Sequence, residues 1–392
     1  MAKAKSRQTA GKASTKGAAA TTGRGRGEKR QTPNQIVKAL DAIDRDVLAA
    51  VARRAELLTE LAMRRETGLV DRVAQESRRI RDLVARDATA AGIAAEDRID
   101  LLRHISSICL QSLHELRVAY LGPQHSYSHL AAIQFFGEGV NLAPVASIPA
   151  VFDAVSRRDA GYGLVPVENS TDGRVVDTLG MFVRKRMEIC GEVLLPIHHQ
   201  LLSRTPRDRI TEVYSKPQAL SQCRGWLASQ LPQAKLVEIS STAAAARLAA
   251  EKPGAAAVAS LEAGREYDLD VIDADIEDNP NNVTRFAVLG RERPAPTGDD
   301  KTAVLFQVAH RPGALADAMR VFQKQGLNLT WIESFPKPER PNEYLFFIEL
   351  SGHREDAAVQ SALERLQRQT ERLEVLGSYA RATLTGVASA ET

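Results

Sequence analysis

The 33 residues from Gln35 to Thr67 contain neither glycine nor proline, and this stretch limits most strongly what the chain can fold into. Apolar residues recur in it at steps of three and four, the spacing of one helical face: Ile36, Leu40, Ile43, Val47 and Val51. A helix of about 30 residues is about 45 Å long, more than one small domain covers. Two further helical stretches, near 72–88 and 97–116, follow. The pattern predicts an intertwined all-α dimer.

From Arg117 onward, strand and helix patterns alternate. We expect strands at 117–121, 162–167, 188–198, 212–215, 235–239, 255–259, 270–276 and 285–289. Helical patterns separate most of them, at 128–136, 149–158, 217–230 and 242–251. Such alternation predicts an α/β domain with helices on the faces of its sheet, large enough for two small lobes with a cleft between them.

A linker rich in proline and charge, Arg291–Lys301, precedes a third pattern. Its order is strand 302–309, helix 313–325, strand 328–335, strand 343–350, helix 354–371 and strand 374–380, which is the ferredoxin-like α+β arrangement. The predicted organisation is therefore a disordered basic tail (1–33), an all-α domain (34–116), a two-lobed α/β domain (117–293) and a ferredoxin-like domain (300–383).

The charge of the chain is concentrated at its N-terminus. Lys and Arg number 52 and Asp and Glu 49, but residues 1–31 hold nine basic residues and one acid. The remainder, with 43 basic and 48 acidic residues, is mildly acidic, so we expect no nucleic-acid partner. No apolar run approaches 18 residues, so we expect no membrane span. The tail also has the composition of an organellar transit peptide, although a disordered extension is the simpler interpretation.

Three cysteines, Cys109, Cys190 and Cys223, are an odd number and form no C-x-x-C pair. A disulfide framework and a structural zinc site are therefore not expected, and the composition favours a reducing, cytoplasmic setting.

Two arginines lie on the apolar face of the first predicted helix, a face that should be buried. Continuing the apolar stripe in helical steps reaches Arg54 and Arg65. A buried, unpaired guanidinium costs on the order of several kcal/mol, so each needs an anion. The anion is either a carboxylate of a neighbouring helix or a bound dicarboxylate, whose geometry the guanidinium matches. Ser107 and Gln111, at i and i+4 on the third helix, are either part of a solvated stripe or part of the same site.

Taken together, this region resembles the all-α chorismate mutase family over about 80 residues. The resemblance rests on Asp44, the stretch Arg54–Leu57, Arg65, Glu76, Ser107 and Gln111. It implies that Arg54 and Arg65 hold carboxylate and ether oxygens of chorismate, and that Glu76 and Gln111 hydrogen-bond its hydroxyl and ether. Two positions depart from the family, since Val37 and Gln75 stand where arginine is usual. A pericyclic rearrangement needs no proton transfer. An enzyme therefore accelerates it by holding the substrate in its reactive conformation and by electrostatic stabilisation of the transition state.

Four short clusters of small polar residues lie at the ends of predicted strands in the α/β region. Glu168 to Gly173 follow an apolar strand, and Gln124 to Ser128 follow the first strand. The segments 214–220 and 281–286 carry the other two. Each could be a helix cap, but polar groups at the carboxyl ends of strands are where α/β proteins bind ligands. The sequence therefore predicts a ligand site at this edge.

These segments together resemble the prephenate dehydratase family over residues 117–290. The segments 162–173 and Thr284-Arg285-Phe286 carry the resemblance. It implies that Thr284 is the catalytic donor and that Arg285 binds a substrate carboxylate. Glu168, Asn169, Ser126 and Gln218 would orient the substrate or complete the donor network. Prephenate loses CO₂ and water to give an aromatic ring, so we expect neither a metal nor an organic cofactor.

Two further features of this region need interpretation. The segment Gln124–Ser128 and Lys216 differ from the family's usual loop and its usual histidine. The first departure keeps a hydroxyl at Ser126. The pair His198-His199 suggests a metal site, but adjacent strand residues face opposite ways, so ordinary strand histidines are the better interpretation.

The C-terminal pattern resembles an ACT regulatory domain. Gly313-Ala314-Leu315 opens its first helix, and Asn328, Glu333 and Ser334 follow on the next strand. The resemblance implies that these six residues bind an amino acid, L-phenylalanine, between paired domains. Phe335 replaces the arginine usual in the Glu-Ser-Arg-Pro motif. By itself, a glycine before a helix is also an ordinary turn.

The sequence thus predicts an enzyme of phenylalanine biosynthesis that rearranges chorismate to prephenate and converts prephenate to phenylpyruvate, as a homodimer or higher homo-oligomer inhibited by L-phenylalanine. One alternative is a dehydratase, for prephenate or arogenate, whose helical domain is only a dimerisation scaffold. A second alternative is an amino-acid-sensing binding protein without catalysis.

Overall fold

The computed structural model describes residues 32–63, 68–86, 92–111, 117–336 and 343–384. The chain divides into two compact units, residues 1–50 and 51–392. The described part of the first unit is the N-terminal half of helix α1 (Pro33–Met63). The predicted basic tail falls on residues 1–31, outside the described part. No helix among the described residues is long and apolar enough to cross a membrane.

Three helices form where the apolar periodicity predicts them. α1 is followed by α2 (Leu69–Arg86) and α3 (Ala95–Gln111). The apolar face of α1 remains exposed: Ile36, Val37, Leu40, Ile43, Val47, Leu48, Leu57 and Leu61 are 46–69% accessible. Val70 and Val73 of α2 and Leu110 of α3 instead join a core with Val118, Tyr120 and Phe136 of the following domain.

The first α/β lobe is built on a six-stranded sheet with the order β2-β1-β3-β11-β5, and β4 pairs with β3. β1, β2 and β3 are parallel, and β11 lies antiparallel between β3 and β5. The strands are β1 (Arg117–Leu121), β2 (Asn141–Val145), β3 (Tyr162–Asn169), β4 (Gly173–Arg174), β5 (Glu188–Pro196) and β11 (Val283–Gly290). The helices are α4 (Tyr127–Phe136), α5 (Ile148–Arg157) and α6 (Val176–Arg184).

The second lobe has a five-stranded sheet with the order β10-β6-β9-β7-β8. Its central strand is entirely buried, as expected for an apolar strand between pairs on both sides. Its strands are β6 (Gln200–Ser203), β7 (Glu212–Ser215), β8 (Lys235–Glu238), β9 (Ala255–Ala259) and β10 (Asp270–Asp273). Its helices are α7 (Pro217–Gln222), α8 (Arg224–Gln230), α9 (Thr242–Glu251) and α10 (Leu261–Glu266), with a 3₁₀ turn at Arg207–Arg209. Two segments, 197–199 and 274–282, run between the lobes.

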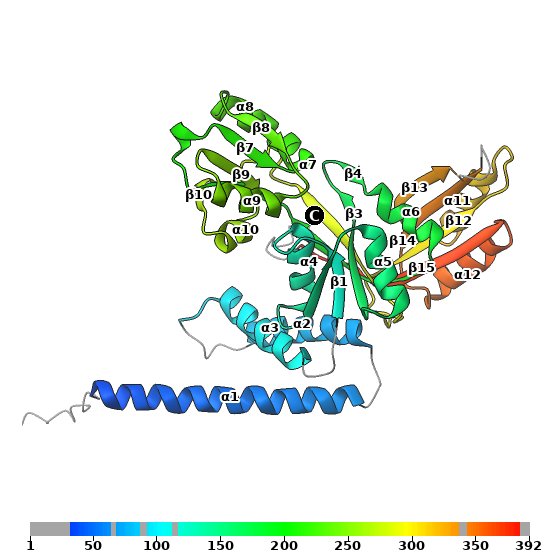
Figure 1. Ribbon diagram of the computed structural model, residues 1–392. Helices are drawn as coiled ribbons and strands as arrows, with labels where there is room; N and C mark the ends of the chain where they lie inside the picture. The colour runs from blue at the N-terminus through cyan, green and yellow to red at the C-terminus, as the bar shows by residue number, and fades with distance from the viewer. Residues whose placement is uncertain (1–31, 64–67, 87–91, 112–116, 337–342, 385–392) are drawn as a thin grey trace, which may run out of the picture. The chain divides into compact units, whose positions relative to one another are not determined.

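The third sheet has the order β13-β14-β12-β15 and confirms the predicted ferredoxin-like sequence of elements. Its elements are β12 (Asp300–Gln307), α11 (Ala314–Lys324), β13 (Leu329–Pro336), β14 (Tyr344–Ser351), α12 (Ala357–Gln367) and β15 (Arg372–Ala380). Figure 1 shows this sheet in yellow, orange and red beside the first lobe.

Both faces of β12, a central strand of the third sheet, are covered. Val304 and Phe306 of β12 pack with α11 and α12, whereas Ala303 and Leu305 share a core with the first lobe. At Gly377 a Cβ atom would come within 2.1 Å of the carbonyl oxygen of Ile189, so glycine is needed where β15 approaches β5. The C-terminal sheet is therefore packed onto the sheet that carries β3 and β11.

Candidate active site

Four of the six residues predicted for the dehydratase site line one cleft. Ser126 and Gln218 come from the starts of α4 and α7, and Asn169 and Thr284 come from the paired strands β3 and β11. The cavity holds about 860 Å³ and is bounded by residues of both lobes. The sequence analysis placed these polar segments at the edge of one sheet, but β7, the strand before Gln218, belongs to the sheet of the second lobe.

The centre of the cleft is a hydrogen bond between Asn169 and Thr284. Thr284 lies opposite Asn169 in the β3–β11 ladder, so their side chains share one face of the sheet. Asn169 Nδ2 donates to Thr284 Oγ1 at 2.9 Å and to Asn282 Oδ1 at 2.9 Å. Asn169 Oδ1 accepts the backbone N–H groups of Thr171 and Asp172, both at 3.0 Å. Since Thr284 Oγ1 accepts from Asn169, its own hydrogen is left to donate into the cleft.

A relay of buried polar groups behind Asn169 was not predicted from the sequence. Asn282 Nδ2 donates to Gln222 Oε1 at 3.0 Å, and His199 Nε2 lies 2.9 Å from the same oxygen. Burial lowers the pKa of His199, so its imidazole is neutral. The Tyr127 hydroxyl donates to the carbonyl oxygen of His198 at 2.7 Å and lies 2.9 Å from His199 Nδ1. The relay fixes the direction of the Asn169 amide.

Ser126 and Gln218 each have a structural partner as well as a place in the cleft. Ser126 Oγ accepts the His129 N–H as the cap of α4. Gln218 and Gln222, one helical turn apart, both donate to the Asp172 carboxylate. Lys216 lines the same cleft and is exposed. Among the described residues that line this cleft it is the single Lys or Arg, a feature to which the sequence prediction gave no role.

Glu168 and Arg285 lie apart from the cleft, on the opposite face of the β3–β11 pair. Arg285 is next to Thr284, and neighbouring strand residues point to opposite faces. Arg285 Nε is 3.2 Å from Glu168, and its Nη1 is 3.4 Å from Glu192 and 2.6 Å from Glu349. Its guanidinium carbon lies 4.5 Å from the centre of the Trp331 ring. Burial alone would lower the pKa of Arg285, but the charges of Glu349 and Glu192 raise it.

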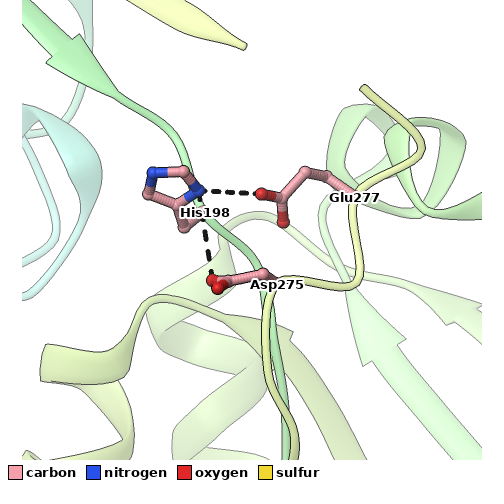
Figure 2. A group of neighbouring side chains, drawn as sticks. All are labelled: His198, Asp275 and Glu277. Atoms are coloured by element: carbon pink, nitrogen blue, oxygen red, sulfur yellow. Dashed lines mark hydrogen bonds and ion pairs between the residues drawn. The ribbon is translucent and has the colours of Figure 1, made fainter. Parts of the chain in front are cut away.

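The two histidines after β5 face different surroundings, as expected, although they lie beyond the end of the strand. His199 lines the cleft, whereas His198 lies beside Asp275 and Glu277, as Figure 2 shows. His198 Nδ1 is 2.8 Å from Glu277 and 4.0 Å from Asp275, and the three possible metal-ligand atoms lie within 4.8 Å of one another. Glu277 also accepts the His199 backbone N–H at 2.8 Å. Hydrogen bonds between the two inter-lobe segments account for this group.

The predicted chorismate mutase residues are brought together in part. Arg54 pairs with Glu76 and donates to Ser106 Oγ at 3.0 Å, which is the interhelical ion pair left open by the sequence. Burial would raise the pKa of Glu76, but the hydrogen bond from Arg79 and the charge of Arg54 lower it. Ser107 is directed elsewhere, since its Oγ accepts the Gly139 N–H at 2.6 Å. Arg65 and the side chain of Gln111 lie outside the described part of the chain.

The predicted effector residues lie at the start of α11 and on or beside β13. Gly313 has φ of 82°, a conformation that favours glycine, and precedes α11, where Ala314 is buried and Leu315 packs against the core. On β13 burial alternates, so Glu333 and Ser334 point to opposite sides. Asn328 and Ser334 are exposed, whereas Glu333 forms an ion pair with Arg174 of β4. The Arg174 guanidinium also lies 6.0 Å from the Phe335 ring.

Known proteins resemble both the α/β and the C-terminal regions. The sequence models of prephenate dehydratase and of the ACT domain match residues 118–294 and 302–368. A bifunctional chorismate mutase/prephenate dehydratase of Aquifex aeolicus is 39% identical over 355 residues, 89% of this chain and 98% of that protein. Since residues 117–392 make up less than three quarters of the chain, this alignment extends into the helical region.

Two further relatives each match about two thirds of the chain. A prephenate dehydratase of Amycolatopsis methanolica is 37% identical over 270 residues, 68% of this chain and 89% of that protein. The crystal structure of a prephenate dehydratase from Arthrobacter aurescens in complex with L-Phe superimposes with a TM-score of 0.63 at 34% identity, covering 68% of this chain and 90% of that one.

Proposed function

Because the chain belongs to the family of bifunctional chorismate mutase/prephenate dehydratases, we propose that its helical region rearranges chorismate and that its cleft converts prephenate to phenylpyruvate. Both reactions are steps of phenylalanine biosynthesis. The observation that carries the dehydratase assignment is the Asn169–Thr284 hydrogen bond, because it leaves the Thr284 hydroxyl free to donate to a ligand in the cleft.

The dehydratase reaction requires little acid–base chemistry from the protein. The C1–carboxylate bond breaks with release of CO₂, its electron pair enters the ring, and the C4–oxygen bond breaks. The departing oxygen takes up one proton from the solvent and leaves as water, while Thr284 keeps its own proton. Thr284 donates a hydrogen bond to this oxygen as negative charge develops on it, in a cleft where such a bond is stronger than in water. Formation of the aromatic ring drives the elimination.

The two carboxylates of prephenate need different surroundings. The side-chain carboxylate remains in the product and needs a cation, and Lys216 is the cationic side chain that lines the cleft. The ring carboxylate leaves as uncharged CO₂, so apolar neighbours such as Val145, Ile148 and Phe286 favour its loss. Ser126 and Gln218 offer the remaining polar contacts. The earlier assignment of a substrate carboxylate to Arg285 stays a prediction, and the four protein contacts of that side chain favour Lys216 in its place.

The mutase site in this proposal contains Arg54, Arg65, Glu76 and Gln111, whereas Ser107, predicted with them, accepts the Gly139 N–H instead. A rigid cationic and hydrogen-bonding frame would hold chorismate in its reactive conformation. The exposed apolar face of α1 supports a homodimer, because burying eight large side chains against a second copy removes a substantial apolar area from water.

Feedback control by L-phenylalanine completes the proposal. It is supported by the ACT-domain match and by the L-Phe complex of the Arthrobacter aurescens relative. Gly313, Ala314, Leu315, Asn328, Glu333 and Ser334 are the proposed effector contacts, with Phe335 in place of the usual arginine.

The test is to supply purified full-length protein with chorismate or with prephenate and to quantify prephenate and phenylpyruvate over time. Phenylpyruvate from chorismate above the uncatalysed background supports both activities. Turnover of prephenate alone reduces the helical region to a dimerisation scaffold, and no turnover of either substrate favours the sensor alternative. A parallel arogenate sample tests substrate preference.

Two variants test the residues. Thr284→Ala should lose about 10²–10³-fold in kcat for prephenate, and undiminished turnover would refute its role. Lys216→Met should raise KM by about tenfold or more and Lys216→Arg much less, whereas Lys235→Met, an exposed lysine on β8, is the matched control.

A further inference from the structure

The strand that carries Thr284 is held from behind by the C-terminal sheet. Arg285 Nη1 lies 2.7 and 2.6 Å from the two carboxylate oxygens of Glu349, which is on β14. The Arg285 side chain is 10% exposed and that of Glu349 is 3% exposed. Trp331 of β13 covers the guanidinium. A substrate in the cleft therefore lies on the far side of the sheet from this guanidinium.

The carboxylates around Arg285 are themselves fixed. Glu349 accepts a hydrogen bond from the Tyr379 hydroxyl at 2.9 Å, and Glu192 is paired with Lys301 at 2.9 Å. Tyr379 and Lys301 belong to the C-terminal sheet, whereas Glu192 and Arg285 belong to the first lobe. Desolvation offsets the attraction within a buried ion pair, so such a pair adds little net stability, whereas the loss of one partner leaves an uncompensated buried charge. This network therefore defines the position of β11 against the C-terminal sheet.

A second contact holds the other partner of the central hydrogen bond. β4 pairs with the end of β3, with Gly173 opposite Asn169 and Arg174 opposite Glu168. Arg174 in turn pairs with Glu333 and lies over Phe335, both on β13. Trp331, Glu333 and Phe335 alternate with exposed residues and so share one face of β13. One face of β13 thus contacts the strand behind Thr284 and the strand beside Asn169.

We propose that Arg285 is a positioning residue, whose buried ion pair with Glu349 sets the distance and direction of the Asn169–Thr284 hydrogen bond. This inference rests on the proposed dehydratase function. The C-terminal sheet is then part of the framework of the catalytic cleft, and a change at β13 reaches Thr284 through Trp331 and Arg285 over a path of adjacent side chains. Because β13 also carries Glu333 and Ser334, the same contacts connect the proposed effector motif with the catalytic threonine.

The experiment uses the full-length protein and Glu349→Gln, which keeps the shape of the side chain and removes its charge. We expect kcat for prephenate to fall at least tenfold, KM to change less than threefold, and the rate of chorismate consumption to stay the same. Glu349→Asp restores the charge on a shorter side chain and should recover part of kcat. Glu364→Gln, on the exposed side of α12, is the matched control and should leave both rates unchanged.

A spectroscopic measurement tests the same contact. The chain has two tryptophans, Trp226 and Trp331, so Trp331 is the one tryptophan left in Trp226→Phe. In that background Glu349→Gln should shift the Trp331 emission, because the cation over the ring moves.

Glu349→Gln with unaltered thermal unfolding and dehydratase kcat within twofold of the parent would overturn the proposal. If Glu349→Gln does not fold, Trp331→Phe replaces it. That variant keeps an aromatic ring but weakens the contact with Arg285, and an unchanged kcat there would equally overturn the proposal. Absence of prephenate turnover by the parent protein would instead refute the proposed function, before any variant is compared.

Discussion

Replacing Asn169 by aspartate tests the central hydrogen bond of the cleft without changing the size of the side chain. The substituted side chain would keep the oxygen that accepts the Thr171 and Asp172 N–H groups at 3.0 Å. It would lose the two donations, to Thr284 Oγ1 and to Asn282 Oδ1, both at 2.9 Å. A carboxylate can only accept, so the Thr284 hydroxyl would turn its hydrogen toward the new carboxylate and away from the substrate.

The expected changes in kcat and in stability follow from the hydrogen bonds that the substitution removes. Loss of one preorganised donor at developing charge costs about 10²–10³ in kcat, or about 2.7–4 kcal/mol. The substitution also changes the stability of the protein, because Asn282 Oδ1 is left facing a second acceptor in a buried position, at a cost of about 1–3 kcal/mol. We therefore expect kcat for prephenate to fall about 100-fold or more with a small change in KM, together with a lower unfolding temperature.

The assay is phenylpyruvate formation from saturating prephenate, with thermal unfolding measured on the same samples. Asn281→Asp is the matched control, since it makes the same chemical change at an exposed asparagine of the neighbouring segment. A folded Asn169→Asp variant with kcat within about threefold of the unmodified protein would refute the argument that Asn169 orients the Thr284 hydroxyl.

Three further predictions concern other parts of the chain. Burial lowers the pKa of His129 from 6.5 to about 4. The free energy of unfolding should therefore decrease by up to about 3 kcal/mol as pH falls through this interval, because the unfolded chain takes up the proton first. Urea titrations at pH 7 and pH 5 should show a smaller decrease in this free energy for His129→Gln than for the parent protein. Arg54→Met should slow chorismate consumption at least tenfold while prephenate turnover persists, and an unchanged rate would exclude Arg54 from the mutase site. Ile43→Glu, on the exposed apolar face of α1, should reduce the mass measured by light scattering, whereas Asp41→Glu should not.

Local sequence patterns identified most elements of the fold. The predicted bounds of β7, β9 and α9 agree with the structure at both ends, because each is a short apolar or alanine-rich run between clear stop signals. β2 and β6 were missed. β2 contains Pro144 and an exposed Asn141, and β6 has four residues, so their strand conformation depends on the ladders they form with β1 and β9.

The cleft was predicted in part for a similar reason. Asn169 and Thr284 stand at strand ends with polar neighbours, a pattern that is visible in the sequence. His199 and Asn282 come from the two inter-lobe segments and Gln222 from a helix, and no spacing along the chain links them. They become partners of one another because the two lobes bring three distant segments to one buried point.

Arg285 shows most clearly what the sequence determines and what only the tertiary structure decides. The sequence by itself predicted a strand that begins at Arg285, directly after Thr284, in an α/β domain. A strand sends adjacent side chains to opposite faces, so only one of them can reach the cleft. Which one does, and what the other meets, was decided by the tertiary structure, which packs the C-terminal sheet and its buried Glu349 against the back of β11.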